Sequence, residues 1–497
     1  MDLLQSLGLG FSVSLDPINL LACFIGVLLG TAIGVLPGIG SVATMSILFP
    51  ITYHMGPAAA LIMLAGIYYG AQYGGSTTAI LVKIPGEASS VMTTIDGYEM
   101  ARQGRAGVAL GIAALGSFVA GTIGVLLITL LALPLTRAAL ALGPPEIFVL
   151  LVFAFVLAAA VVEGSRVKGL AMALVGLLLG TVGLDVIYGI PRFAFGTTLL
   201  LDGIGLVPMV MGLFGVAEVL INLERRIDRV VLGARVSRLL PNRAEIRESA
   251  GPIARGSVLG FVLGLCPGFG AVIPPFIAYG IEKRLARDPS TFGRGAIAGV
   301  AGPESANNAA AAGGMVPLLA LGIPGNVVMA ILLGALLTHG VHAGPLLARD
   351  HPDIFWGVIA SMYIGNVMLL VLNLPLIRLW VGLLKVPYGV LFPIVLLLCT
   401  AGVYATSREP WDIAVMLSFG LIGYGMRKTG YEPAPLVLAF VLGKLAEESV
   451  RQSLLMSSGR LAIFLERPIS LALLVCGGLA ILLWLGRRAG RTRSAGS

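Results

Sequence analysis

One pattern of glycine and proline occurs twice in this chain. Residues 30–40 read GTAIGVLPGIG and residues 260–270 read GFVLGLCPGFG, so both follow G-x-x-x-G-x-x-P-G-x-G at a displacement of 230 positions. A spaced pattern that recurs at a fixed displacement is the sequence signature of an internal repeat. The chain is therefore predicted to consist of two related halves.

A second pair of motifs supports the same division. The sequences GG at 74–75 and IPG at 84–86 recur as GG at 313–314 and IPG at 323–325, displaced by 239 positions. The two displacements differ by nine, which predicts an insertion between the motifs in the later half.

The composition places both halves in a membrane. Of 497 residues, 57% are hydrophobic and 12% are charged, against about 25% charged in ordinary globular proteins. Apolar runs near the roughly 17–25 residues of a spanning helix recur along the chain. Clear examples are 18–36, 107–133, 147–162, 169–184, 355–374 and 469–485. We expect an all-α polytopic membrane protein with about 11–13 spans, some of them broken or re-entrant helices.

Basic residues indicate which segments face the cytoplasm. The stretch 224–255 carries eight arginines against four acidic residues, and four more arginines follow residue 486. The positive-inside rule assigns both segments to the cytoplasm, and basic residues placed between and after spans do not indicate a nucleic-acid partner. The first 16 residues contain no Lys or Arg, so the halves are expected to start on opposite sides, as an inverted repeat. The expected division is a first membrane repeat at 1–223, a basic linker at 224–255, a second repeat at 256–486 and a cytoplasmic tail at 487–497.

The repeated Pro-Gly steps predict that a membrane span ends or unwinds in each half. Proline removes a backbone donor, and glycine readily leaves helical geometry. Unwound backbone at membrane depth survives where it is buried in protein or lines a wet cavity, and a break repeated in both halves is typical of a transporter binding site. The residues expected to act as hinges or to bind a cation are Pro37, Gly38, Gly40, Pro267, Gly268 and Gly270. The alternative is a plain kink beside a seam of small residues that packs helices together.

Uncharged polar residues gather beside these breaks. Hydroxyls bind a carboxylate without adding charge in a low-dielectric site, and the N-terminus of a half-helix favours an anion. Adjacent asparagines in an apolar stretch offer carbonyl oxygens to Na⁺ or to substrate hydroxyls. The residues expected to bind substrate are Ser76, Thr77, Thr78, Pro85, Gly86, Asn307, Asn308, Pro324, Gly325 and Asn326. The alternative is that these hydroxyls bond within their own helix and the asparagines bond between helices.

Three ionisable residues are expected near the breaks or at membrane depth. Lys83, Glu87 and Glu304 are candidates to modulate charge at the site, although Lys83 and Glu304 could each instead snorkel to an interface. No Cys or carboxylate completes a metal set with His339 and His342, and the motifs of metalloproteases and serine hydrolases are missing. These features disfavour an intramembrane enzyme, and separate polar clusters disfavour the continuous lining of a channel. Neither a cofactor nor a metal beyond a transported Na⁺ is expected.

The motifs together resemble the large membrane subunit of the bacterial tripartite tricarboxylate transporters. The resemblance runs through nearly the whole chain and rests on GTAIGVLPGIG, YGGSTTAILVKIPGEASS with DGYEMARQGRAG, GPESANNAAAAGG with LGIPG, and EPAPLVLAFVLGKLAEES. It implies a secondary, cation-coupled importer of citrate or other small carboxylates in the bacterial inner membrane, driven by Na⁺ or H⁺. It also implies two protein partners, a small four-span membrane subunit and a periplasmic solute-binding protein. Lys83 departs from the family's pattern, in which a neutral polar residue such as Asn is more usual, and this departure bears on which carboxylate is carried.

Overall fold

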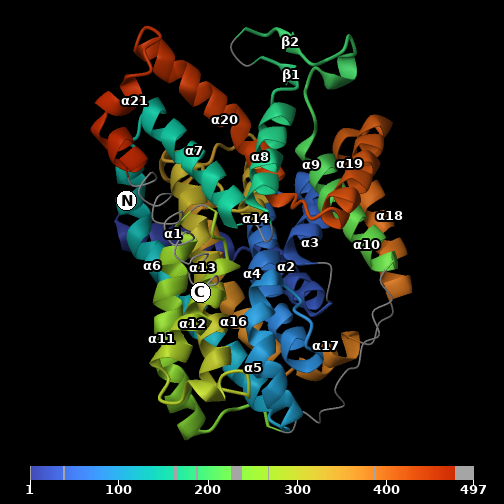
Figure 1. The fold of residues 1–497 in the computed structure, drawn as a ribbon, viewed down its shortest axis with the longest axis vertical. Helices are drawn as coiled ribbons and strands as arrows, with labels where there is room; N and C mark the ends of the chain where they lie inside the picture. The colour runs from blue at the N-terminus through green and yellow to red at the C-terminus, as the bar shows by residue number, and fades with distance from the viewer. Residues whose placement is uncertain are drawn as a thin grey trace, which may run out of the picture.

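The chain folds almost entirely into helices. The computed structural model describes residues 2–36, 40–161, 165–185, 188–224, 238–266, 268–384 and 388–475. Within them the only sheet is a two-stranded hairpin (Figure 1), and four helical segments are long and apolar enough to cross a membrane by themselves. These segments are Pro17–Val35, Ala106–Ala139, Leu206–Glu224 and Pro352–Asn373. The expected all-α polytopic membrane class is confirmed.

The elements before the linker contain both short and spanning helices. In chain order they are α1 (Leu3–Ser14), α2 (Pro17–Val35), α3 (Gly40–Leu48), α4 (Pro57–Val82), α5 (Val91–Arg102), α6 (Ala106–Ala139), α7 (Pro144–Val161), α8 (Arg166–Gly180), β1 (Gly183–Leu184), β2 (Pro191–Arg192), α9 (Leu206–Val210) and α10 (Ala217–Glu224). A π-helical turn at Met211–Val216 joins α9 to α10.

The elements after the linker are all helical. They are α11 (Arg243–Gly264), α12 (Ile273–Leu285), α13 (Ala298–Leu321), α14 (Val327–Thr338), α15 (Leu347–Asp350), α16 (Pro352–Asn373), α17 (Ile377–Leu383), α18 (Tyr388–Ser407), α19 (Pro410–Lys428), α20 (Ala434–Met456) and α21 (Ile463–Glu466). Residues 225–237 of the expected linker and the expected tail at 487–497 lie outside the described residues.

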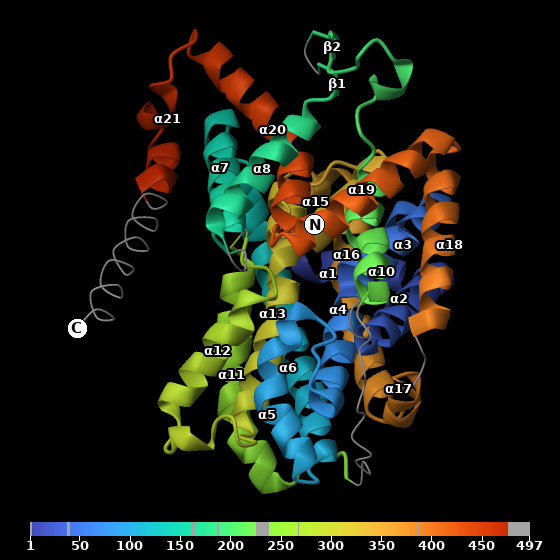
Figure 2. The ribbon, with the colours of Figure 1, turned by 45° about the vertical axis from the view of Figure 1, so that its right-hand side comes forward.

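Helices α4 and α13 form the centre of the molecule. Every residue at 59–82 in α4 and at 299–320 in α13 is buried. A helix that is buried on all sides needs neighbours on all sides. Helices α2, α5, α6 and α16 pack against α4, while α5, α6, α11 and α12 pack against α13 (Figure 2).

Glycines bring the backbones of these central helices into direct contact with an outer helix. A Cβ added to Gly30 of α2 would lie 2.4 Å from the Ile67 carbonyl oxygen of α4, and one added to Gly260 of α11 would lie 2.2 Å from the Ala306 carbonyl oxygen of α13. Contacts of this kind pair Gly26 with Met63, Gly30 with Ile67, Gly34 with Ala71, Gly256 with Gly302, Gly260 with Ala306 and Gly264 with Ala310. The glycines of α2 and α11 in these pairs differ by 230 positions, and their partners in α4 and α13 differ by 239. These are the displacements of the two repeated sequence motifs.

The β1–β2 hairpin lies at the same end of the molecule as the later part of α20, opposite the start of α11 (Figure 2). Its strands are antiparallel, with Gly183 opposite Arg192. Arg192 bonds to Glu447 of α20 at 2.6 Å, and Arg451 of α20 bonds to Asp185 at 2.9 Å. This ion-pair network fixes the hairpin to α20.

Candidate functional site

Both central helices end in a left-handed residue that is followed by Ile-Pro-Gly. Helix α4 ends at Lys83 with φ +61°, and α13 ends at Gly322 with φ +71°. A left-handed residue commonly closes the last turn of a helix, and the proline two residues later cannot continue it. The positions of Lys83 and Gly322 differ by 239, so the two central helices end at corresponding points.

The outer helices α2 and α11 also end beside these breaks. Leu36 precedes a proline and has extended backbone, with φ −88° and ψ 102°, because the proline ring disfavours helical geometry in the residue before it. Gly268 adopts φ +96°, which glycine reaches without steric cost. The Gly268 N–H donates to the Gly325 carbonyl at 2.8 Å, which ties the end of α11 to the break after α13. The expected hinge residues Pro37, Gly38 and Pro267 lie outside the described residues.

A cavity of about 360 Å³ lies where the breaks meet. This volume is within the range of about 300–1,000 Å³ that is common for small-molecule sites. Segments far apart in the sequence line it: Ser41, Val42, Glu87, Ala88 and Ser89; then 268–272 and 325–328; and also Tyr68, Gln72, Ala158, Glu432, Ala434, Pro435 and Leu438. Gly268, Gly270, Gly325 and Asn326 of the predicted set therefore share one cavity with Glu87.

Corresponding residues of the two halves lie at or beside the cavity. Glu87 and Asn326 differ by 239 positions, and Gly40 and Gly270 differ by 230. A Cβ added to Gly40 would lie 3.8 Å from the Glu87 carboxylate, and one added to Gly270 would lie 3.3 Å from the Asn326 amide nitrogen. Each polar side chain thus lies against the left-handed glycine of the neighbouring break, which has φ +68° at Gly40 and φ +54° at Gly270.

Two helices begin at the cavity. At the start of α3 the Ser41 N–H donates to the Glu87 carboxylate. At the start of α14 the Met329 N–H donates to Asn326 Oδ1 at 2.9 Å, so Asn326 is the N-cap. The remaining N–H groups of a first turn and the helix dipole favour an anion at such positions.

The fixed charges at the cavity are acidic. Among its described lining residues, Glu87 and Glu432 are the charged ones. A neighbouring cavity of about 270 Å³ shares Glu87 and contains the ion pair of Arg427 with Glu218. The Arg427 guanidinium is therefore close to the site, but it is already paired with Glu218.

None of the three predicted hydroxyls of α4 lines the 360 Å³ cavity. Ser76 Oγ donates to Glu304 Oε2 at 2.5 Å. Thr78 Oγ1 donates to the Val35 carbonyl at 2.7 Å, which joins α4 to α2. Thr77 lines a space of about 10 Å³ beside α6, no larger than a single water needs.

The asparagine pair of α13 also lies away from the cavity lining. Asn307 Nδ2 donates to Glu304 Oε2 at 3.3 Å, and Asn308 Nδ2 donates to Ser117 Oγ of α6 at 2.8 Å. The structure thus brings Ser76, Asn307 and Glu304 into one buried cluster.

The remaining predicted residues lie at or near the breaks. Pro85 and Gly86 line the 270 Å³ cavity, and Pro324 is buried without lining either one. Lys83 is exposed, and its ammonium lies 5.3 Å from the centre of the Tyr98 ring, a cation–π contact. Lys83 does not line the 360 Å³ cavity.

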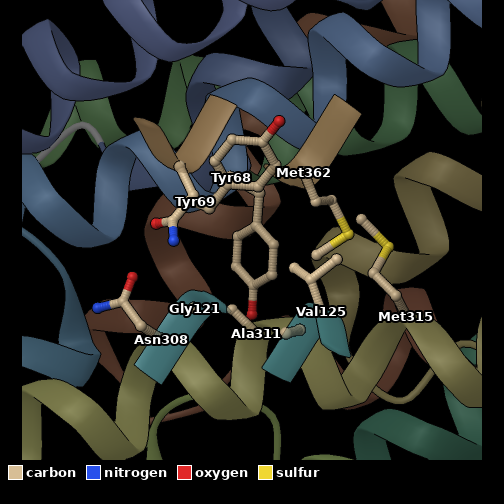
Figure 3. A pocket seen from close by; sticks show the side chains of 10 residues that line it. Tyr68, Tyr69, Gly121, Val125, Asn308, Ala311, Met315 and Met362 are labelled. Carbon is tan, nitrogen blue, oxygen red and sulfur yellow. The ribbon is translucent and has the colours of Figure 1, made fainter. Parts of the chain in front are cut away.

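Figure 3 shows a smaller space between α4, α6, α13 and α16. Its lining includes Tyr68, Tyr69, Asn308, Met315 and Met362. Its volume of about 20 Å³ is enough for a single water. This space is therefore too small for a carboxylate substrate.

Sequence reasoning missed several lining residues and one structural carboxylate. Ser41, Tyr68, Gln72 and Glu432 line the cavity. Sequence signals lay beside three of them: Ser41 directly follows the first motif, Gln72 directly precedes YGGSTTAILVKIPGEASS, and Glu432 begins EPAPLVLAFVLGKLAEES. Asp96 of the DGYEM motif accepts three backbone N–H bonds from residues 293–296 at 2.8–2.9 Å. Its carboxylate fixes α5 to the loop before α13.

Comparison with known proteins identifies the family. Residues 20–438 match the model of the tripartite tricarboxylate transporter TctA family. Over 477 residues the chain is 50% identical to an uncharacterized 52.8 kDa protein in the TAR-I ttuC' 3'region of Agrobacterium vitis, with 96% of this chain and 95% of that protein covered. Over 226 residues it is 46% identical to an uncharacterized protein in the TAR-II ttuC' 3'region of the same organism, with 46% of this chain and 93% of that protein covered. No solved structure matches the chain. The chain is a multi-pass membrane protein that belongs to the tripartite tricarboxylate transporter TctA family, as its motifs predict.

Proposed function

We propose that this chain is the large permease subunit of a tripartite secondary transporter that imports citrate or related small carboxylates, and that the 360 Å³ cavity holds the substrate. The observation that carries the proposal is that residues at or shortly after the Pro-Gly steps of both halves line one cavity of ligand size. Discontinuous helices that meet around a single site are the usual construction of a transporter binding site. The role is transport, and no catalytic step is proposed.

Neutral polar groups would hold the carboxylates of the substrate. The first turn of α14 presents N–H groups at the cavity, and Gln72, Ser89 and Asn326 add amides and a hydroxyl. Such groups bind an anion without placing a fixed positive charge in a low-dielectric site.

The acidic lining supports the proposed cation coupling. A carboxylate that enters beside Glu87 adds negative charge to a cavity whose described lining has no basic side chain. A co-transported Na⁺, or alternatively a proton, would offset that charge, so anion and cation would stabilise the occupied state together.

The corresponding glycine contacts of α2 with α4 and of α11 with α13 support two membrane repeats at 1–223 and 256–486. We infer that they are inverted and alternate access around the cavity. The basic segments at 224–255 and 487–497 would face the cytoplasm of a bacterial inner membrane. A small four-span subunit and a periplasmic solute-binding protein would complete the tripartite system that the family name describes.

Uptake of labelled citrate into proteoliposomes that contain all three components tests the proposal. We expect saturable uptake that needs an inward Na⁺ or proton gradient and falls at least tenfold in Asn326→Ala. Asn19→Ala is the matched control, because Asn19 bonds to the Val13 carbonyl near the start of α2 and does not line the cavity. Flux that neither saturates nor depends on a gradient would contradict the proposal and indicate a channel.

A further inference from the structure

We propose that the Glu304 carboxylate is the binding site of the coupling cation, a Na⁺ or a proton, separate from the substrate cavity. This inference rests on the proposed transport function and gives the coupling ion a location. Glu304 lies on the central helix α13 and is 0% exposed.

Three buried polar side chains from three helices converge on this carboxylate. Ser76 Oγ of α4 donates to Glu304 Oε2 at 2.5 Å, and Asn307 Nδ2 of α13 donates to the same oxygen at 3.3 Å. Thr93 Oγ1 of α5 donates to Glu304 Oε1. The three partners are at most 4% exposed, so the cluster is closed to bulk water.

Within the described part of the chain, no positive side chain pairs with the carboxylate. None of the ion pairs in the described part of the chain includes Glu304. Three other ionisable groups on the surrounding helices have partners of their own. Asp96 of α5 accepts backbone N–H bonds and the Tyr279 hydroxyl of α12, Glu282 of α12 pairs with Arg255 of α11 at 2.6 Å, and the Tyr73 hydroxyl of α4 donates to Asn366.

An ionised carboxylate in such a place is strongly disfavoured unless a positive charge joins it, since neutral donors recover only part of its lost hydration. Serine and threonine hydroxyls can donate or accept. Ser76 and Thr93 can therefore donate to the bare carboxylate, and can turn their oxygens toward a hard cation or a carboxylic proton when one is bound.

A spare oxygen lies beside the cluster. Ser90 Oγ is buried and has no hydrogen-bond partner in the described part of the chain. It faces α4 at Gly75, where an added Cβ would lie 2.7 Å from it. Ser90 precedes Thr93 by three residues at the start of α5, and residues three apart are neighbours on a helix, so Ser90 Oγ is a further oxygen on the side of α5 that meets Glu304.

The cluster is one helical turn from the substrate cavity along two helical segments. Gln72 and Ser89 line the cavity and bond to each other. Ser76 follows Gln72 by four residues on α4, and Thr93 follows Ser89 by four residues at the start of α5. Because residues four apart are neighbours on a helix, a cation that fixes Ser76 and Thr93 also fixes the groups that face the substrate.

Thermal unfolding of the purified full chain in detergent, without substrate, tests this inference. Unfolding temperatures are measured in NaCl and in choline chloride at equal ionic strength, and over a pH series in choline chloride. If Na⁺ is the ion, NaCl raises the unfolding temperature of the wild type in a saturable way and does not raise that of Glu304→Gln. If a proton is the ion, lower pH alone stabilises the wild type, and Glu304→Gln removes this effect. Glu99→Gln, which changes a partly buried carboxylate of α5 that pairs with Arg102 at 3.1 Å, should keep the wild-type response. A response that is missing from the wild type, or unchanged in Glu304→Gln, would overturn the inference.

A second variant covers the case in which Glu304→Gln does not fold. Thr93→Val keeps the side-chain shape and removes one oxygen, so the Na⁺ concentration or proton concentration needed for half-maximal stabilisation should rise several-fold. An unchanged midpoint would count against the site. Citrate exchange in proteoliposomes separates this inference from the proposed function: exchange without any cation effect refutes the cation site alone, and a cation effect without exchange of any carboxylate refutes the proposed function alone.

Discussion

Replacing Gly30 by alanine tests whether α2 and α4 are joined by direct backbone contact. The new Cβ would lie 2.4 Å from the Ile67 carbonyl oxygen and 2.8 Å from the Ile67 Cα, whereas ordinary contacts begin near 3.4 Å. Because both obstructing atoms are backbone, no side-chain rotation relieves the clash. The two helices must separate locally by about 1 Å, in a core that is packed as densely as an organic crystal.

The cost of this separation is estimated from overpacked cores. Inserting a methyl group that forces a backbone shift costs typically about 1–3 kcal/mol. Alanine recovers about 0.5–1 kcal/mol relative to glycine within a helix. A net loss of about 1–2 kcal/mol lowers the ratio of folded to unfolded protein by a factor of about 5–30. Gly260→Ala should cost a similar amount, because its Cβ would lie 2.2 Å from the Ala306 carbonyl oxygen.

Thermal unfolding of the purified chain in detergent measures the effect. Gly30→Ala should unfold several degrees below the wild type. Gly8→Ala is the matched control, since Gly8 also lies in a helix and a Cβ there meets no atom within 4 Å, and it should unfold at the wild-type temperature or slightly above. Equal unfolding temperatures for Gly30→Ala and Gly8→Ala would refute the reasoning.

Three further changes test other parts of the structure. Lys83→Gly should keep wild-type uptake and unfold at the same or a higher temperature, because a non-glycine residue at φ +61° costs about 1–2 kcal/mol; lost uptake would show that the ammonium is required. Glu87→Ala should unfold at a lower temperature than Glu87→Gln, because only alanine leaves an N–H of α3 without its acceptor, at a cost of about 1–3 kcal/mol; equal temperatures would argue against that bond. Replacing both Arg192 and Arg451 by alanine should speed proteolysis of the β1–β2 hairpin by more than the two single changes combined, because either arginine alone can still neutralise the buried Asp185; additive effects would count against the network.

The ends of the central helices could be predicted because their causes are local. The Ile-Pro-Gly steps after Lys83 and Gly322 lie where α4 and α13 end, since proline cannot continue a helix and the left-handed residue closes it. The membrane class followed from composition and from the lengths of the apolar runs. These features depend on a few neighbouring residues, and the sequence displays those directly.

The surroundings of individual side chains could not be predicted in the same way. Ser76, Thr77 and Thr78 are adjacent in the sequence, but successive residues on a helix point about 100° apart. Ser76 therefore bonds to Glu304 of α13, whereas Thr78 bonds to Val35 of α2. Because α4 is buried on every side, its hydrophobic pattern does not show which face meets the cavity. Glu304 contacts Thr93 across 211 positions, and only the packing of α5 against α13 brings these two residues together.

The central claim is that the cavity between the breaks holds the carboxylate, and protection of an engineered cysteine tests it most directly. Ala271 lines the cavity and corresponds to Ser41 at the displacement of 230. Ala271→Cys is placed in a chain whose native cysteines Cys23, Cys266, Cys399 and Cys476 are replaced by alanine, and its rate of modification by a small thiol reagent is measured with and without citrate. Ser290→Cys, in an exposed loop, is the control. The account predicts that citrate, in the presence of Na⁺, slows modification of Ala271→Cys. The effect should appear near the citrate concentration that half-saturates uptake, and the modification rate of Ser290→Cys should not change. Equal modification rates at Ala271→Cys with and without saturating citrate, in a variant that still transports citrate, would contradict it.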